Sequence, residues 1–99
     1  MMATFFHWRL NEGARDAFLA SWAMITDALK EHGSLGSTLF EDEDGTVRAL
    51  ARWPDQATRD RAFDRLQMPE AVDAMQAAVA ETLLRVDCVE IDNRWTLKP

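Results

Sequence analysis

Tryptophan side chains are spaced along this chain in a way that suits the wall of a binding pocket. Segment 46–53 reads Thr-Val-Arg-Ala-Leu-Ala-Arg-Trp and stops at Pro54, and Trp8 lies in an earlier apolar segment of the same kind. Indole rings bury a large apolar surface and keep one polar N–H, so a pocket rimmed by them would take a small hydrophobic or aromatic molecule. Trp8, Trp22 and Trp53 are therefore candidate pocket residues, with packing alone as the alternative for Trp22.

One histidine could supply acid–base chemistry to such a pocket. His7 lies in the same strand-like segment as Trp8, and an imidazole can exchange a proton near neutral pH. Successive side chains of a strand point to opposite faces, so His7 should point away from Trp8. His7 is the candidate catalytic base, and the alternative is packing on the opposite face near Arg48 or Arg52.

The elements that must position these residues begin with a strand, a helix and a hairpin. Segment 4–10 is rich in aromatic residues and predicts a strand. Apolar residues recur at helical spacing through 14–32, which predicts a helix. Segments 35–40 and 46–53 predict two antiparallel strands, because the Asp-Gly pair at 44–45 is typical of a hairpin turn.

The second half of the chain predicts a broken helix and a last strand. A helix is expected over 55–66, and Pro69 interrupts it before a second helix over 71–84. The apolar face of that second helix would consist of Val72, Met75, Val79 and Leu83. Segment 85–95 is rich in β-branched residues and predicts the closing strand, in which Cys88 should be buried.

This order predicts a single α+β domain over 1–99 with the ferredoxin-like βαββαβ arrangement, in which one four-stranded antiparallel sheet carries helices on one face. The face without helices would still carry large apolar side chains such as Phe5 and Leu50. An exposed apolar sheet invites association. We therefore expect a homodimer formed between sheet faces.

Composition excludes several classes of function. The 99 residues carry a net charge of −6 and no block of Lys or Arg, which disfavours nucleic acid as a partner. No apolar run approaches the roughly 20 residues that span a bilayer, and no export signal is recognisable, so a cytoplasmic protein without membrane contact is expected. Motifs for a metal site or a phosphate loop are absent from the sequence.

Three short segments are similar to those of a known superfamily. They are Trp8-Arg9-Leu10, the segment 32–37 (His-Gly-Ser-Leu-Gly-Ser) and Ala51-Arg52-Trp53-Pro54. With the order of elements, they resemble the antibiotic biosynthesis monooxygenase superfamily of dimeric α/β barrels. The resemblance implies a cavity between the sheet and the helices of each subunit. Some members oxidise aromatic polyketides or quinols with neither metal nor flavin, and others oxidise bound haem.

The resemblance also assigns individual positions. Trp53 matches the tryptophan that ends the third strand in both groups. In the polyketide oxygenases an asparagine, a tyrosine and an arginine stand at places that look like Ala49, Arg59 and about Met75 here. The haem-oxidising group has an asparagine near the place of Trp8 and an axial histidine in the last helix, where this chain has none, so no cofactor is expected. The substrate-binding candidates are Trp8, Trp22, Trp53, Ala49 and Met75.

Two functions follow from these residues. The first is a cofactor-independent monooxygenase-like activity on a small aromatic or quinol-like substrate, because an electron-rich phenolate or enolate can itself reduce dioxygen. The alternative is a non-catalytic dimeric module that binds a small hydrophobic ligand, which the missing polar groups favour.

Overall fold

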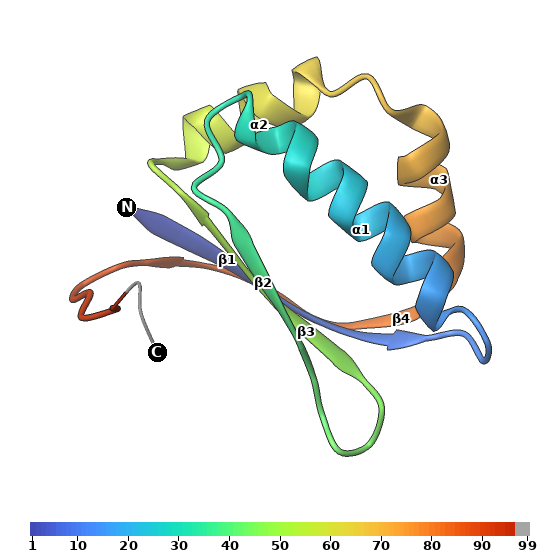
Figure 1. Ribbon diagram of the computed structural model, residues 1–99. Helices are drawn as coiled ribbons and strands as arrows, with labels where there is room; N and C mark the ends of the chain where they lie inside the picture. Colours follow the sequence, from blue (N-terminus) through green and yellow to red (C-terminus); the bar gives the residue numbers. More distant parts are fainter. Residues whose placement is uncertain (97–99) are drawn as a thin grey trace.

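Strands and helices alternate along the chain in the predicted order (Figure 1). The computed structural model describes residues 1–96. In chain order the elements are β1 (Met2–Leu10), α1 (Arg15–Lys30), β2 (Ser37–Glu41), β3 (Val47–Trp53), α2 (Gln56–Arg65), α3 (Pro69–Ala78) and β4 (Val79–Val89). Within the described residues, no helix is long and apolar enough to cross a membrane.

The strands form one antiparallel sheet in the order β2-β3-β1-β4. Met2 pairs with Trp53, and Phe5 pairs with Leu50 on one side and with Val86 on the other. The helices all cover the same face of the sheet (Figure 1). This topology confirms the predicted α+β, ferredoxin-like fold.

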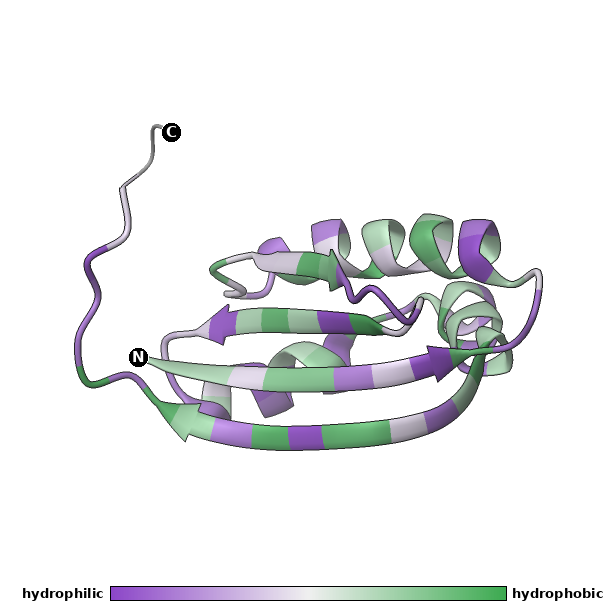
Figure 2. Ribbon diagram, turned by 90° about the horizontal axis from the view of Figure 1, so that it is seen from below, coloured by the Kyte–Doolittle hydropathy of each residue, from purple (hydrophilic) through white to green (hydrophobic). Residues whose placement is uncertain are grey.

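The two faces of the sheet differ because side chains alternate along each strand. Figure 2 shows how polar and apolar residues are distributed along the strands. Thr4 and Trp8 point toward the helices and are buried, whereas Phe5 on the other face is partly exposed. Two buried clusters lie under the helices, one around Trp8 and Phe18 and the other around Trp53 and Ile25.

The break in the second crossover is present where Pro69 predicts it. Asp55 caps the N-terminus of α2, where its Oδ1 accepts a hydrogen bond from the backbone N–H of Thr58 at 2.7 Å. The backbone N–H of Leu66 bonds to Phe63 at the other end of α2. Pro69 then takes the first position of α3, where the missing N–H of proline costs no helical hydrogen bond.

The predicted end of α3 was wrong. The helix stops at Ala78 rather than at residue 84, and Val79 already pairs with Leu10 in the sheet. Asn11 closes this end, because its backbone N–H bonds to the carbonyl of Ala78 at 2.8 Å and its side-chain amide bonds to that of Ala77 at 2.9 Å. Backbone pairing with the long strand β1 therefore overrides the helical spacing of Val79 and Leu83.

The last strand also differs from the prediction at its other end and in one side chain. It ends at Val89, and residues 90–95 have no regular structure. Cys88 is exposed rather than buried. It pairs with Ala3 on the face of the sheet that no helix covers.

Candidate functional site

A cavity of about 620 Å³ lies between the helix-covered face of the sheet and the helices. Its wall takes residues from all four strands and from all three helices. Its volume falls in the range of roughly 300–1,000 Å³ that is usual for small-molecule sites. Most of the wall is apolar, formed by residues such as Phe6, Ile25, Leu29, Phe63 and Val72.

The structure brings four of the sequence-predicted site residues together and leaves two outside. Trp8, Trp22, Trp53 and Met75 all line the cavity. Ala49 is buried in the same cluster as Trp8 but is not part of the wall. His7 is also outside the cavity, because strand alternation places it on the opposite face of the sheet from Trp8.

Ring packing orders the aromatic part of the cavity wall. Phe6 stacks on Trp8 with ring centroids 4.7 Å apart, and Trp8 meets Phe18 edge to face at 5.3 Å. Trp53, only 2% exposed, contacts Phe63 of α2 with centroids 6.1 Å apart. Such pairs hold the rings in fixed orientations, so this part of the wall is preformed.

A buried arginine is the site residue whose role sequence reasoning missed. Arg59 is 5% exposed and lines the cavity from α2. Its Nη1 donates to Oγ1 of Thr4 at 3.0 Å and to Oδ1 of Asp87 at 2.5 Å, and Thr4 Oγ1 itself donates to Asp87 at 2.9 Å. Two signals could have revealed it: the resemblance places Arg59 where polyketide oxygenases have a tyrosine, and Arg59 lies one helical turn before the buried Ala62.

The Arg59–Asp87 pair sets the electrostatics of this end of the cavity. The hydrogen bond from Arg59 holds the pKa of the Asp87 carboxyl below its ordinary value, against a smaller opposing effect of burial. Burial lowers the pKa of Arg59, but its hydrogen bonds to Asp87 and Asp60 outweigh burial and leave that pKa raised. Both groups are therefore ionised at neutral pH.

Two further ionisable residues reach the wall. The guanidinium of Arg85 lies over the Phe6 ring, 5.8 Å from its centroid. Glu81 forms a solvent-exposed ion pair with Arg9. Arg59, by contrast, carries its charge in the buried part of the wall.

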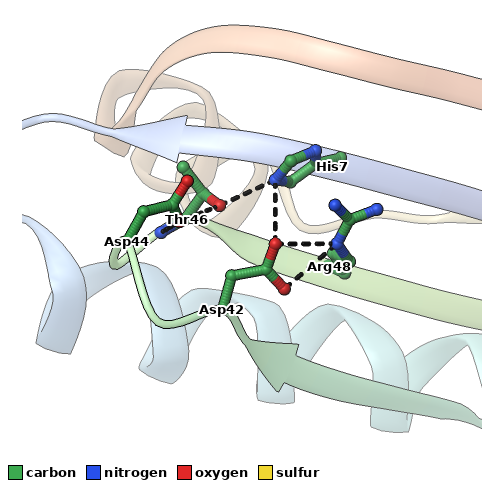
Figure 3. Close-up of polar contacts among 5 residues, drawn as sticks. All are labelled: His7, Asp42, Asp44, Thr46 and Arg48. Atoms are coloured by element: carbon green, nitrogen blue, oxygen red, sulfur yellow. Dashed lines mark hydrogen bonds and ion pairs between the residues drawn. The ribbon is translucent and has the colours of Figure 1, made fainter.

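His7 belongs to a separate polar cluster at the β2–β3 hairpin (Figure 3). Its Nε2 lies 2.7 Å from Oγ1 of Thr46 and 3.7 Å from Oδ2 of Asp42. Asp42 also accepts two hydrogen bonds from Nε of Arg48, at 3.0 and 3.1 Å. Thr46 is held in turn by Asp44, which accepts from its hydroxyl at 2.6 Å and from its backbone N–H at 2.9 Å.

The hydrogen bonds of this cluster fix the role of the histidine. The single hydroxyl hydrogen of Thr46 goes to Asp44, so Oγ1 must accept the hydrogen bond from His7 Nε2. Nε2 therefore carries a proton and cannot take one from Thr46. The hydrogen bonds that Asp44 accepts from the hydroxyl and the backbone N–H of Thr46 lower the pKa of the Asp44 carboxyl. The arrangement ties the hairpin to β1 and is not a nucleophile–base pair.

Acidic, histidine and cysteine side chains do not gather into a group of three able to hold a metal ion anywhere in residues 1–96. The ionisable groups that line the cavity are arginines and one glutamate. The arrangement is suited to binding an apolar ring system that carries a hydrogen-bond-accepting oxygen.

Comparison with known proteins addresses the fold. The sequence matches no protein-family model and no curated protein. Solved structures do match: a Chloroflexus aurantiacus protein classed as an antibiotic biosynthesis monooxygenase superposes with a TM-score of 0.82 at 14% identity, over 95% of this chain and 96% of the other. The chain has the fold of the antibiotic biosynthesis monooxygenases.

A second neighbour of this fold carries a described activity. SnoaB of Streptomyces nogalater, a cofactor-independent oxygenase, superposes with a TM-score of 0.75 at 18% identity, over 99% of this chain and 97% of the other. A third, Rv0793 of Mycobacterium tuberculosis, has a TM-score of 0.77 at 14% identity, over 93% and 96% of the two chains. These likenesses confirm the resemblance at the level of the antibiotic biosynthesis monooxygenase fold.

Proposed function

We propose that this protein is a cofactor-independent monooxygenase that acts on a small aromatic or quinol-like molecule. The observation that carries the proposal is the cavity itself, in which Trp8, Trp22 and Trp53 surround a space of about 620 Å³ and a buried Arg59 is the polar anchor. A cofactor-independent oxygenase with the same fold, SnoaB, supports the class of reaction. The apolar wall supports an aromatic substrate.

The proposed chemistry comes from the substrate. An electron-rich phenolate or enolate transfers one electron to dioxygen, and the resulting radical and superoxide combine into a peroxide at a ring carbon. If that carbon began as CH₂, loss of water from the peroxide leaves a carbonyl, so one oxygen atom enters the product and the other leaves as water. The protein has to bind the anion, exclude water and keep the reacting ring in place.

The proposed roles of the site residues follow their positions. Trp8, Trp22, Trp53 and Met75 contact the ring system of the substrate. Ala49 acts indirectly, since it pairs with Phe6 between β1 and β3 and its small side chain leaves room for the stacked Phe6–Trp8 pair. His7, on the other face of the sheet, has no role in this proposal.

We also propose that two copies of the chain associate through the helix-free sheet faces. Phe5, Leu84 and Val86 lie on this face and are 37%, 42% and 40% exposed. Leu50 lies beside Phe5 on the same face. A second copy would bury these side chains and the Cys88 thiol, and would remove an apolar surface that favours aggregation.

One observation favours the second candidate, a binding module without catalysis. In the described part of the chain, Glu81 is the one carboxylate in the cavity wall, it is paired with Arg9, and no histidine lines the wall. A protein that only stores or carries an aromatic ligand would need the same apolar wall and no base. Binding without turnover is therefore the outcome that this candidate predicts.

Oxygen uptake with anthrone as substrate separates the two functions. The proposed enzyme should consume one dioxygen per anthrone, form anthraquinone and place one ¹⁸O atom from ¹⁸O₂ in the product, at a rate above spontaneous oxidation. Quenching of tryptophan fluorescence reports binding in the same samples. Quenching with oxygen uptake equal to the protein-free control would support the binding module, and Trp53→Ala should lose both signals.

A further inference from the structure

We infer that Arg59 recognises an ionised oxygen on the ligand, so that the cavity binds an acidic aromatic hydroxyl as its phenolate or enolate. This inference rests on the proposed function, because it concerns the occupant of the same cavity. It adds the charge state of that occupant and the residue that selects it.

Arg59 has a hydrogen-bond donor that residues 1–96 do not use. Arg59 Nη1 is engaged by Thr4 and Asp87, and Nε donates to Oδ1 of Asp60 at 3.2 Å. Within residues 1–96, Nη2 has no hydrogen-bond partner. Every fully buried polar side-chain atom of these residues does have one. Nη2 is therefore accessible, and it faces the open space of the cavity that Arg59 lines.

This donor lies at one end of the cavity. Thr4, Ala51 and Asp87 lie side by side on three neighbouring strands, and Arg59 closes over them from α2. Trp8 lies four residues further along β1, which corresponds to about 13 Å of extended strand. The cavity thus has a polar end at Arg59 and an aromatic end at the Phe6–Trp8 pair, which matches a ring system with one oxygen at its edge.

The charge around Arg59 favours a single oxyanion as its partner. Asp87 already balances Arg59, so the site is not set up for a multiply charged group such as a phosphate. A single oxyanion can share the guanidinium, because Nη1 serves the carboxylate while Nη2 has no partner among the described residues. An oxygen held there would sit in a mostly apolar surrounding, where an interaction with a cation is stronger than in water.

The chemical consequence is that the protein can favour deprotonation of its ligand without a base. A cation within about 4–6 Å stabilises the ionised form of an acid and lowers its pKa, commonly by about 1–3 units. The proton is released to solvent. This would account for a cavity wall that has an arginine at its buried end and no histidine.

The test uses 2-naphthol and its methyl ether, 2-methoxynaphthalene. The absorbance of naphtholate reports ionisation directly, and quenching of tryptophan fluorescence reports binding of both probes. Bound naphthol should ionise about 1–2 pH units below free naphthol, which behaves as a phenol with a pKa of about 10. As the pH rises toward this range, naphthol should bind progressively tighter, whereas the ether should not.

Variants change the charge in opposite directions. Arg59→Met should abolish the shift in ionisation while leaving the ether bound. Asp87→Asn should enlarge the shift, because it removes the charge that competes for Arg59. An unfolded variant could not show a larger shift in ionisation. Asp87→Asn therefore keeps the test decisive if Arg59→Met fails to fold. Arg65→Met, an exposed arginine on the same helix, is the matched control and should leave the shift unchanged.

The outcomes separate the inference from the proposed function. If both probes bind and bound naphthol ionises at the same pH as free naphthol, the inference is overturned while an aromatic-binding cavity stands. If Arg85→Met rather than Arg59→Met abolishes the shift, Arg59 is not the anion-binding residue and the inference is also overturned. If neither probe binds, the inference and the proposed function fail together.

Discussion

Arg59 and Asp87 join α2 to the inner face of β4 through a hydrogen bond of 2.5 Å between Nη1 and Oδ1. Thr4 of β1 bonds to both partners, so one small cluster connects a helix to two strands. The same cluster forms the polar end of the cavity. Stability and ligand binding are therefore coupled at this point.

The first prediction is that this pair makes the free energy of unfolding depend on pH in the acid range. The pKa of Asp87 is lowered in the fold, mainly by the hydrogen bond from Arg59. Its stabilising contribution is therefore present above the unfolded-state pKa of about 4 and is lost as the pH falls through the lower folded-state value. We expect Asp87→Asn to flatten the decrease of the free energy of unfolding below about pH 4, measured by urea denaturation across a pH series.

This flattening should be partial. The pKa values of Asp44 and Asp55 are also lowered, by hydrogen bonds to Thr46 and Thr58 respectively, and both carboxylates remain in the variant. Parallel curves for the wild type and Asp87→Asn over the whole acid range would contradict a stabilising role for the pair.

The second prediction concerns a close approach between Gly33 and α2. A Cβ on Gly33 would lie 2.6 Å from Cγ2 of Thr58, whereas a Cβ on Gly36 would meet nothing within 4 Å. Both glycines have positive φ, +106° and +104°, so replacement by Ala costs backbone strain at each, of about 1–3 kcal/mol. Gly33→Ala should lower the free energy of unfolding by at least about 1 kcal/mol more than Gly36→Ala, because of the added overlap.

A second substitution isolates that overlap. Thr58→Ser removes the Cγ2 methyl group and keeps the backbone N–H that Asp55 caps. In the Thr58→Ser background, Gly33→Ala and Gly36→Ala should cost nearly the same in a denaturation experiment. An undiminished difference would mean that the contact with Thr58 is not its cause.

The fold was largely predictable because its signals are local. Turn residues and apolar spacing gave the order of elements, and Pro69 gave the break between α2 and α3. The end of α3 was not predictable in this way, since Val79 fits the apolar face of a helix as well as it fits a strand. Its pairing with Leu10 depends on β1, which lies almost seventy residues away.

The candidate site was predictable only in its apolar part. Trp8, Trp22 and Trp53 are large residues whose burial is expected from their type, and they do line the cavity. Arginine is rarely buried unless it is paired, and the partners Thr4 and Asp87 that allow Arg59 to be buried come from distant strands. No local pattern joins these three residues before the chain is folded.

The third prediction tests the proposed dimer. Val86→Lys places a charge on the helix-free sheet face, beside the apolar Phe5 with which Val86 pairs. If this face is the interface, the variant should sediment as a monomer at concentrations at which the wild type is a dimer. Met24→Lys, at an exposed apolar position on α1, is the control and should remain dimeric. Dissociation by Met24→Lys alone would move the interface to the helices.

The last prediction distinguishes the two faces of β1 by function. If His7 were the catalytic base, its replacement should slow turnover by about 10²–10⁴-fold. The structure instead gives His7 a hydrogen bond to Thr46 on the face away from the cavity. We therefore expect His7→Leu to lower the free energy of unfolding by about 1 kcal/mol, the usual contribution of one hydrogen bond, and to leave anthrone oxidation and naphthol binding within about twofold of wild type. Trp53→Phe provides the opposite pattern, because a smaller ring in the cavity wall should weaken naphthol binding, as measured by fluorescence titration. A large loss of turnover in His7→Leu with unchanged stability would restore His7 as the base and would require the substrate to reach the other face of the sheet.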